Sequence, residues 1–109
     1  VPHLNRTPMK LSGGERQLLT LAMATLHQPK MILVDEPLTG LSPQNITFMI
    51  ENMNLLNQKR GITLIIVEHS VKEAINIVKR VISLKFGMIF NDLKITPNFN
   101  LEKLNSVFI

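Results

Sequence analysis

Residues 30–37 read KMILVDEP, and this short stretch decides how the rest of the chain is interpreted. Its four consecutive apolar residues, 31–34, predict a strand that is buried on both faces, as in a parallel sheet. Two carboxylates follow directly, and ligands of open α/β sheets bind outside the carboxyl ends of the strands. Asp35 and Glu36 are therefore candidate functional residues. Pro37 has no backbone N–H and would interrupt the hydrogen-bond ladder.

Downstream of this strand, the pattern predicts a helix and then a second strand. Ser42 is a favourable N-cap and is followed by a proline at the first position of a helix expected over residues 43–58. The β-branched run at 62–67 predicts the next strand. Strand, helix and strand in this order form a βαβ unit with parallel strands. The second strand brings two further polar groups, Glu68 and His69, to its carboxyl end.

Upstream of the strand lies a glycine-rich helix start. Residues 11–17 read LSGGERQ, and Ser12 followed by Glu15 three positions later has the form of a capping box. We expect the helix to end near Gln28, because Pro29 disfavours helical geometry in the residue before it. Glycines are poor helix formers, so two in the first turn indicate that something approaches the backbone closely. A helix N-terminus also offers free amides to an anion.

The C-terminal part of the chain predicts a short helix and a hairpin. Ser70 and Glu73 repeat the capping-box form. Strands are expected at 81–84 and 88–90, joined by a turn that contains glycine. Residues 91–100 are expected to be a polar connection. No internal repeat or low-complexity segment interrupts this order.

Composition narrows the possible functions. The chain has 109 residues, 45% of them hydrophobic, which favours a packed globular core. The absence of cysteine excludes disulfides and thiolate metal sites, and the three histidines are scattered without metal-ligand spacing. The net charge of +4 is spread along the chain without a cluster, and no Trp or Tyr offers a stacking platform. We therefore expect no nucleic-acid site, no membrane span and no secretory leader.

Three features point to one kind of chemistry: a glycine-rich helix N-terminus, a carboxylate pair after one strand and a histidine after the next. Ser12 could add a hydroxyl donor to the helix N-terminus as a phosphate site. Asp35 suits Mg²⁺, which takes oxygen ligands and keeps several waters. Glu36 could deprotonate or orient a water for attack on a phosphoryl group. Together these parts predict nucleoside triphosphate hydrolysis.

In their order and spacing, these residues resemble the second half of the nucleotide-binding domain of the ATP-binding cassette (ABC) ATPases. The similar motifs are a signature sequence at 11–17, a Walker B strand at 31–35 followed by the catalytic carboxylate at Glu36, a D-loop at 37–43 and a switch histidine in 67–69. The resemblance covers residues 10–90. The sequence around the motifs is most similar to that of the importer ATPases for branched-chain amino acids.

The resemblance implies an α/β fold, a partial P-loop NTPase fold with a parallel sheet and flanking helices but without the phosphate-loop strand. It divides the single partial domain into a signature helix at 11–28, a core from Walker B to the switch histidine at 30–90, and a C-terminal extension at 91–109. Many members of the family have Asp where this chain has Ser42. Capping is therefore the expected role of Ser42, rather than a D-loop contact.

The resemblance also implies roles and partners. Asp35 would hold Mg²⁺ through water, Glu36 would act on the attacking water, and His69 would contact the γ-phosphate of ATP. In a head-to-tail dimer, the signature residues would bind the ATP of the opposite subunit; these are Ser12, Gly13, Gly14, Glu15 and Gln17. A transmembrane permease would be the second partner. The expected location is cytoplasmic, peripheral on the inner face of the cell membrane, and the expected role is to energise amino acid import.

One motif of the family is missing. A phosphate-binding loop needs G-x-x-x-x-G-K-[ST], and none of the five glycines is followed by lysine. Our hypothesis is a fragment, or a split gene product completed by another chain, and we expect the isolated chain to be inactive. Two alternatives stay open: a regulatory, non-catalytic ABC partner, and a DNA-repair type of ABC ATPase. The DNA-repair class would bring long heptad-patterned coiled coils, which this sequence lacks.

Overall fold

The computed structural model describes the chain except residues 1–4, 6, 8–10, 70, 101 and 108–109. Ser70, the predicted cap of the third helix, therefore lies outside the described residues. The chain divides into two compact units, residues 1–73 and 74–109, which are described separately below. The elements in chain order are α1 (Gly13–Ala24), β1 (Met31–Asp35), α2 (Pro43–Arg60), β2 (Thr63–Val67), α3 (Val71–Ala74), β3 (Arg80–Lys85), β4 (Met88–Lys94) and α4 (Glu102–Val107).

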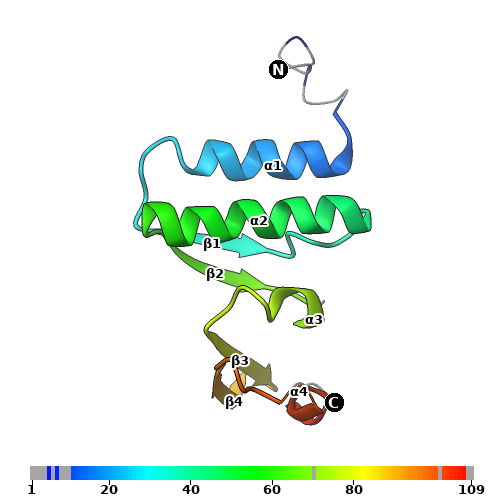
Figure 1. The fold of residues 1–109 in the computed structure, drawn as a ribbon, viewed down its shortest axis with the longest axis vertical. Helices are drawn as coiled ribbons and strands as arrows, with labels where there is room; N and C mark the ends of the chain where they lie inside the picture. The colour runs from blue at the N-terminus through cyan, green and yellow to red at the C-terminus, as the bar shows by residue number, and fades with distance from the viewer. Residues whose placement is uncertain (1–4, 6, 8–10, 70, 101, 108–109) are drawn as a thin grey trace. The chain divides into compact units, whose positions relative to one another are not determined.

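The first unit is built on the predicted βαβ arrangement. Strands β1 and β2 pair in parallel, with a register that runs from Met31 opposite Thr63 to Asp35 opposite Val67. Helix α2 is the crossover between them, and α1 lies beside α2 (Figure 1). The α/β class and the parallel pairing predicted from the sequence are confirmed.

Capping residues set both ends of helix α2. The Ser42 hydroxyl accepts a hydrogen bond from the Asn45 amide at 3.3 Å, and Pro43 occupies the first turn. At the other end, Gly61 adopts a left-handed conformation with a φ of 66°, which glycine reaches without steric cost. The predicted role of Ser42 as a cap is therefore confirmed.

Helix α1 is shorter than predicted. Its start is capped by Ser12, whose hydroxyl accepts from the Glu15 amide at 3.2 Å, but its last residue is Ala24 rather than one near Gln28. The Thr25 hydroxyl donates to the carbonyl of Ala22 at 2.7 Å. The amides of Thr25 and Leu26 donate to carbonyls three residues back, those of Ala22 and Met23, at 3.1 and 3.2 Å. Such bonds tighten the last turn of a helix, so α1 ends before the limit that Pro29 would impose.

The core of the first unit lies between the helices and one face of the β1–β2 sheet. Met49 and Met53 of α2 are each only 1% exposed, and Leu21, Ile32 and Ile62 are also buried. Met49 and Met53 are four residues apart and therefore lie on the face of α2 that forms the core. A buried methionine of this kind contributes about 2 kcal/mol by leaving water.

The prediction that β1 is buried on both faces is wrong for the described chain. Ile32 is 8% exposed, but the next residue, Leu33, is 73% exposed, and its register partner Ile65 is 49% exposed. Alternate residues of a strand point to opposite faces, and only one face of this sheet has helices packed on it. Within the first unit, no described element covers the other face.

The second unit contains an antiparallel hairpin. Strands β3 and β4 turn at Phe86 and Gly87, whose φ angles of 52° and 75° fit the left-handed pair of a two-residue hairpin turn. Strand β4 continues to Lys94, so the predicted polar connection from residue 91 begins too early. Asn91 pairs opposite Ser83, which extends the ladder through residues that composition alone assigned to a loop. Among the described residues, no helix has the length and apolar content needed to cross a bilayer.

An ion pair links the two strands of this hairpin and makes its stability depend on pH. Arg80 donates from Nε and Nη2 to the two carboxylate oxygens of Asp92 at 2.8 and 2.6 Å. These hydrogen bonds, and then the Arg80 charge, lower the pKa of Asp92 below its ordinary value of 3.8. Stability from the pair is therefore fully present above the unfolded-state pKa and is lost as pH falls through the folded-state pKa.

We expect Asp92→Asn to lower the free energy of unfolding slightly near neutral pH, because both partners are solvent-exposed. Urea unfolding of the wild type and the variant should converge once the pH is well below 3.8, where Asp92 is protonated in both states. A difference that stays constant across this range would contradict the ion-pair explanation.

Candidate functional site

The predicted site lies at one end of the first unit. Strands β1 and β2 both point toward the end at which α1 and α2 begin (Figure 1). This arrangement combines the carboxyl ends of parallel strands with two helix N-termini, where backbone amides and the helix dipole favour anions. Every site residue predicted from the sequence belongs to this unit.

Glu36 and His69, predicted separately, form a direct contact. His69 Nε2 lies 2.7 Å from Glu36 Oε1, and their side chains are 83% and 38% exposed. The Glu36 amide also donates to the Val67 carbonyl at 2.8 Å, which joins the ends of the two strands. Glu36 has a φ of 48°, a left-handed conformation that a residue with a side chain rarely adopts. The backbone therefore turns sharply at the residue that carries the carboxylate.

Thr39 is a residue of this site that the sequence analysis did not select. Its hydroxyl oxygen lies 3.5 Å from Glu36 Oε2, and its amide donates to the Glu36 carbonyl at 3.3 Å. The two oxygens of Glu36 therefore face different side chains, His69 and Thr39. The resemblance places Thr39 within the D-loop at 37–43 but gives it no role; its position three residues after Glu36 is a separation that a tight turn brings together.

Asp35 ends β1 opposite Val67 and is exposed. Within the described ranges, no group of three or more Asp, Glu, His or Cys residues could hold a metal ion. A single carboxylate still fits Mg²⁺, which usually keeps several waters and uses one or two protein carboxylates together with phosphate oxygens. Asp35 therefore fits a water-mediated role in which other ligands complete the coordination.

The two signature glycines differ in their surroundings. A Cβ atom at Gly13 would meet nothing within 4 Å, so the backbone there is open. At Gly14, a Cβ atom would stand 2.7 Å from Cγ and 3.0 Å from Cβ of Asn45 on α2. The backbone approach indicated by the sequence is therefore, at Gly14, the approach of α2 to α1. Ser12, the third member of this turn, is exposed and caps the helix.

A hollow of about 270 Å³ joins the signature helix to the loop after β1. It is lined by Gly13, Arg16, Gln17, Thr20, Thr39, Gly40 and Leu41. The structure therefore places the predicted signature residues Gly13 and Gln17 beside the predicted D-loop. Arg16 adds a cation at this hollow that the sequence analysis did not assign to the site. Glu15, also predicted, is half-buried one turn into α1.

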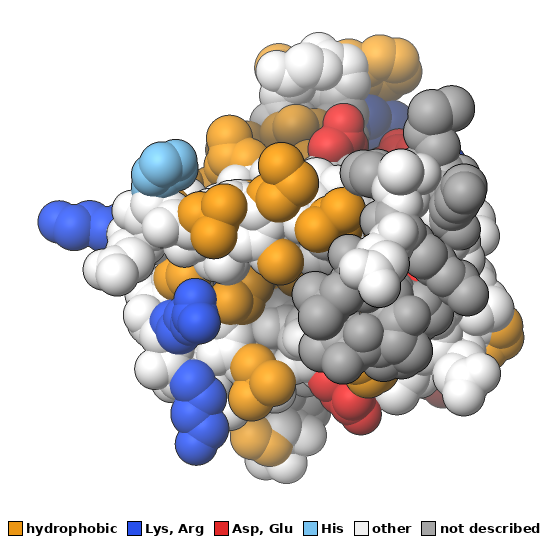
Figure 2. Space-filling view, turned by 90° about the horizontal axis from the view of Figure 1, so that it is seen from above, with side chains coloured by type: hydrophobic (Ala, Val, Ile, Leu, Met, Phe, Trp, Pro, Cys, Tyr) orange, Lys and Arg blue, Asp and Glu red, His pale blue; other side chains and the backbone are white. Residues whose placement is uncertain are grey.

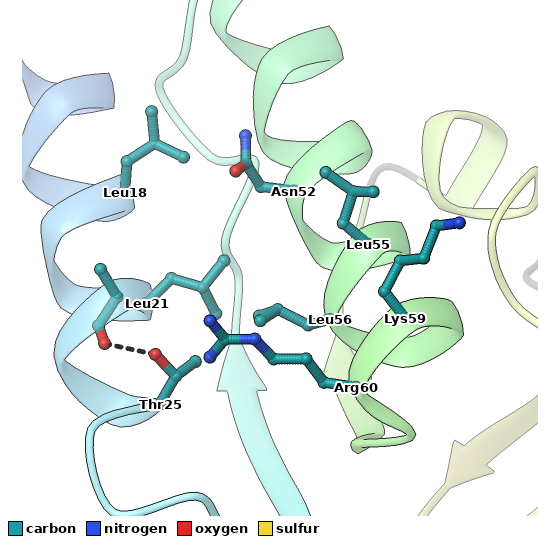
Figure 3. Close-up of a pocket in the computed structure, with 9 residues that line it drawn as sticks. Leu18, Leu21, Thr25, Asn52, Leu55, Leu56, Lys59 and Arg60 are labelled. Atoms are coloured by element: carbon teal, nitrogen blue, oxygen red, sulfur yellow. Dashed lines mark hydrogen bonds between the residues drawn. The ribbon is translucent and has the colours of Figure 1, made fainter.

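A larger groove, of about 380 Å³, lies farther along α1 and α2 (Figure 3). Four leucines form much of its walls together with Ala22, Thr25 and Asn52, and Lys59 and Arg60 come from the last turn of α2. Figure 2 shows the apolar face beside it, with Lys and Arg side chains along one margin; Leu19, Met23 and Leu26 of α1 are exposed. None of the predicted site residues lines this groove.

Comparison with known proteins relates the chain to ABC transporters. The ABC transporter family profile matches residues 2–39. The chain is 40% identical over 91 residues to the aliphatic sulfonates import ATP-binding protein SsuB of Pseudomonas fluorescens, a match covering 84% of this chain and 34% of that protein. It is 35% identical over 98 residues to the phosphonates import ATP-binding protein PhnC of Escherichia coli, a match covering 90% of this chain and 37% of that protein. The chain thus spans about a third of the length of these relatives.

Solved structures agree with the sequence matches. A nucleotide-free ATP-binding cassette from an ABC transporter matches with a TM-score of 0.82 and 27% identity, covering 97% of this chain and 40% of that one. A dimeric cassette in a post-hydrolysis state, bound to ADP and Pi, matches with a TM-score of 0.74 and 30% identity, covering 84% of this chain and 39% of that one. The predicted fold, part of an ABC ATPase domain, is confirmed.

The prediction that the chain belongs to a branched-chain amino acid importer is not supported. The relatives named above import sulfonates and phosphonates, not branched-chain amino acids. The sequence around the motifs therefore does not identify the solute. In sequence and in fold, the chain is similar to part of the nucleotide-binding domain of ABC transporters.

Proposed function

We propose that the chain forms part of the ATP-hydrolysing subunit of an ABC importer. The single observation that carries the proposal is the contact between Glu36 and His69 at the carboxyl ends of β1 and β2. A carboxylate with one oxygen held by an imidazole keeps a second oxygen for a water molecule. Such a carboxylate has the chemistry of a general base.

The proposed roles follow from this placement. Glu36 accepts a proton from the attacking water, and His69 orients Glu36 and reaches toward the terminal phosphate. Asp35, exposed at the end of β1, binds Mg²⁺ through water. Bound Mg²⁺ supplies charge neutralisation for the phosphates. The exposure of these three side chains fits a site whose nucleotide is held mainly by other parts of the assembly.

We propose that the signature residues at the start of α1 bind the phosphates of a second ATP. Ser12, Gly13 and Gly14 open α1 at the same end of the unit, and the backbone at Gly13 is accessible. Glu15 follows in the same first turn, and Gln17 lies at the start of the next turn. A head-to-tail dimer would place this helix N-terminus on the phosphates bound by the partner subunit. A solved relative of this fold is dimeric and was captured with ADP and Pi, which supports this arrangement.

The solute and the membrane partner follow from the relatives. Two of them are named as import ATP-binding proteins for aliphatic sulfonates and for phosphonates, so we propose import of an oxyanion of this kind rather than of an amino acid. A transmembrane permease would be the second partner, and the subunit would lie at the inner face of the membrane. No nucleic-acid partner is proposed.

A phosphate-binding loop must come from residues outside these 109, because the sequence contains no such motif. The β1–β2 sheet has an apolar face that no described element of the first unit covers, and β2 pairs only with β1 among the described strands. Both features fit a sheet that is completed by further residues. We therefore propose that the 109 residues alone do not hydrolyse ATP.

The test is Glu36→Gln in the complete subunit, in which this chain is joined to residues that carry a phosphate-binding loop. Loss of general-base catalysis should lower ATP turnover by about 10²- to 10⁴-fold while ATP binding persists. Glu51→Gln, an exposed glutamate on α2, is the matched control and should retain wild-type turnover. Turnover by Glu36→Gln within a few-fold of the wild type would refute the catalytic assignment.

A further inference from the structure

Thr39 belongs to a loop whose position is fixed by the core. The two residues before it, Pro37 and Leu38, are almost completely buried, at under 2% and at 3% exposure. The Thr39 amide donates to the Glu36 carbonyl at 3.3 Å, which closes a turn over these buried residues. The Thr39 side chain is itself exposed, so its hydroxyl is presented at the surface from a rigid base.

This turn directs the Thr39 hydroxyl to the oxygen of Glu36 that His69 leaves free. His69 Nε2 is 2.7 Å from Oε1, and Thr39 Oγ1 is 3.5 Å from Oε2. Hydrogen bonds between oxygens are usually about 2.7–2.8 Å long, so the second contact is a loose one. A loose contact leaves Oε2 able to accept a proton, because the oxygen is not fully engaged by a donor.

We propose that Thr39 is a positioning residue for Glu36, a proposal that rests on the function proposed above. The branched side chain of threonine has restricted rotation about χ1, so its hydroxyl occupies a defined place beside Oε2. A hydroxyl both donates and accepts hydrogen bonds. Thr39 therefore limits the rotation of the Glu36 carboxylate and supports the water that Oε2 deprotonates.

Thr39 assists the hydrolysis step, in which each bond formed is matched by a bond broken. The water oxygen forms a bond to the terminal phosphorus of ATP, the bond from that phosphorus to the ADP oxygen breaks, and one water proton moves to Glu36 Oε2. Thr39 exchanges no proton in this step. Its removal should therefore lower the rate of the chemical step and leave the binding of ATP unchanged.

The experiment compares three variants of the complete subunit. Thr39→Val keeps the branched shape but removes the hydroxyl, and Thr39→Ser keeps the hydroxyl. Thr47→Val is the matched control, since Thr47 is an exposed threonine on α2 whose hydroxyl donates to the Pro43 carbonyl at 3.2 Å, within the helix and away from Glu36. We expect Thr39→Val to lower kcat about tenfold at constant KM, with Thr39→Ser and Thr47→Val within about threefold of the wild type.

A double-mutant cycle separates positioning from a general structural effect. In the Glu36→Gln background, Thr39→Val should have no further effect on the residual rate, since the two residues act as a unit. The proposal is overturned if Thr39→Val keeps the wild-type kcat, if KM rises instead, or if the two losses multiply. Thr39→Ala serves as a second hydroxyl-free variant should valine crowd the loop.

The same data distinguish this proposal from the function on which it rests. If Glu36→Gln abolishes turnover and Thr39→Val does not lower it, only the role of Thr39 fails. If Glu36→Gln retains turnover, the catalytic assignment itself fails and the role of Thr39 fails with it.

Discussion

Replacing Gly14 by alanine is expected to push the first turn of α1 away from α2 and to lower the free energy of unfolding. The new methyl group would stand 2.7 Å from Cγ and 3.0 Å from Cβ of Asn45. Alanine gains up to about 1 kcal/mol over glycine in a helix, but overpacking costs about 1–3 kcal/mol. Because Asn45 Cβ is attached to the α2 backbone, rotation of the side chain does not remove the clash, so the overpacking cost should prevail.

Gly13→Ala is the matched control, since it makes the same chemical change one residue earlier, where nothing lies within 4 Å. Urea unfolding should show a lower midpoint for Gly14→Ala and an equal or higher one for Gly13→Ala, with unchanged slopes. Three atoms of Asn45 crowd the new methyl group: Nδ2, Cγ and Cβ. Adding Asn45→Ala to Gly14→Ala removes Nδ2 and Cγ and should recover part of the lost free energy of unfolding. Equal midpoints for the two glycine variants would show that this packing does not limit stability.

The second large effect is expected at Met53. Its side chain is 1% exposed in the core between α2 and the sheet, so Met53→Ala should leave a cavity that costs about 2–5 kcal/mol. Since a typical domain is stable by only about 5–15 kcal/mol, this is a large part of the total. Loss of cooperative thermal unfolding, or a strongly lowered Tm, would be the observed result.

Leu55→Ala is the control for Met53→Ala. Leu55 lies on the same helix only two residues away but is 53% exposed, so its truncation should cost at most about 1 kcal/mol. The pair separates core packing from helix propensity, because both changes create alanine in the interior of α2. If the two variants lost stability equally, burial would not explain the loss.

Much of the fold could be predicted because it is specified locally. Ser12 and Ser42 cap their helices as the sequence indicated, and the apolar stripe of α2 lies in the core. The continuous apolar run of β1 predicts burial on both faces but does not reveal which further layers are present among the described residues, so the exposure of Leu33 was not predictable. The early end of α1 coincides with backbone hydrogen bonds to residues three positions back at Thr25 and Leu26, a change that has no clear sequence signature.

The candidate site was predicted in its parts but not in its geometry. Parallel strands bring their carboxyl ends to one edge, so the proximity of Glu36 and His69 follows from the predicted topology. The direct contact between them does not, because it depends on the left-handed backbone at Glu36. Thr39 was missed for the same reason: its approach to Oε2 is a property of the turn, not of residue spacing.

The left-handed backbone at Glu36 has a consequence for how this sequence can change. Glycine adopts a φ of 48° freely, whereas a residue with a side chain pays about 1 kcal/mol or more to stay there. Selection for folding alone would therefore favour glycine or asparagine at this position. Selection for a carboxylate opposes that drift. Position 36 is thus a point of conflict between folding and chemistry, and stabilising substitutions accumulated elsewhere in the chain can offset its cost without touching the site.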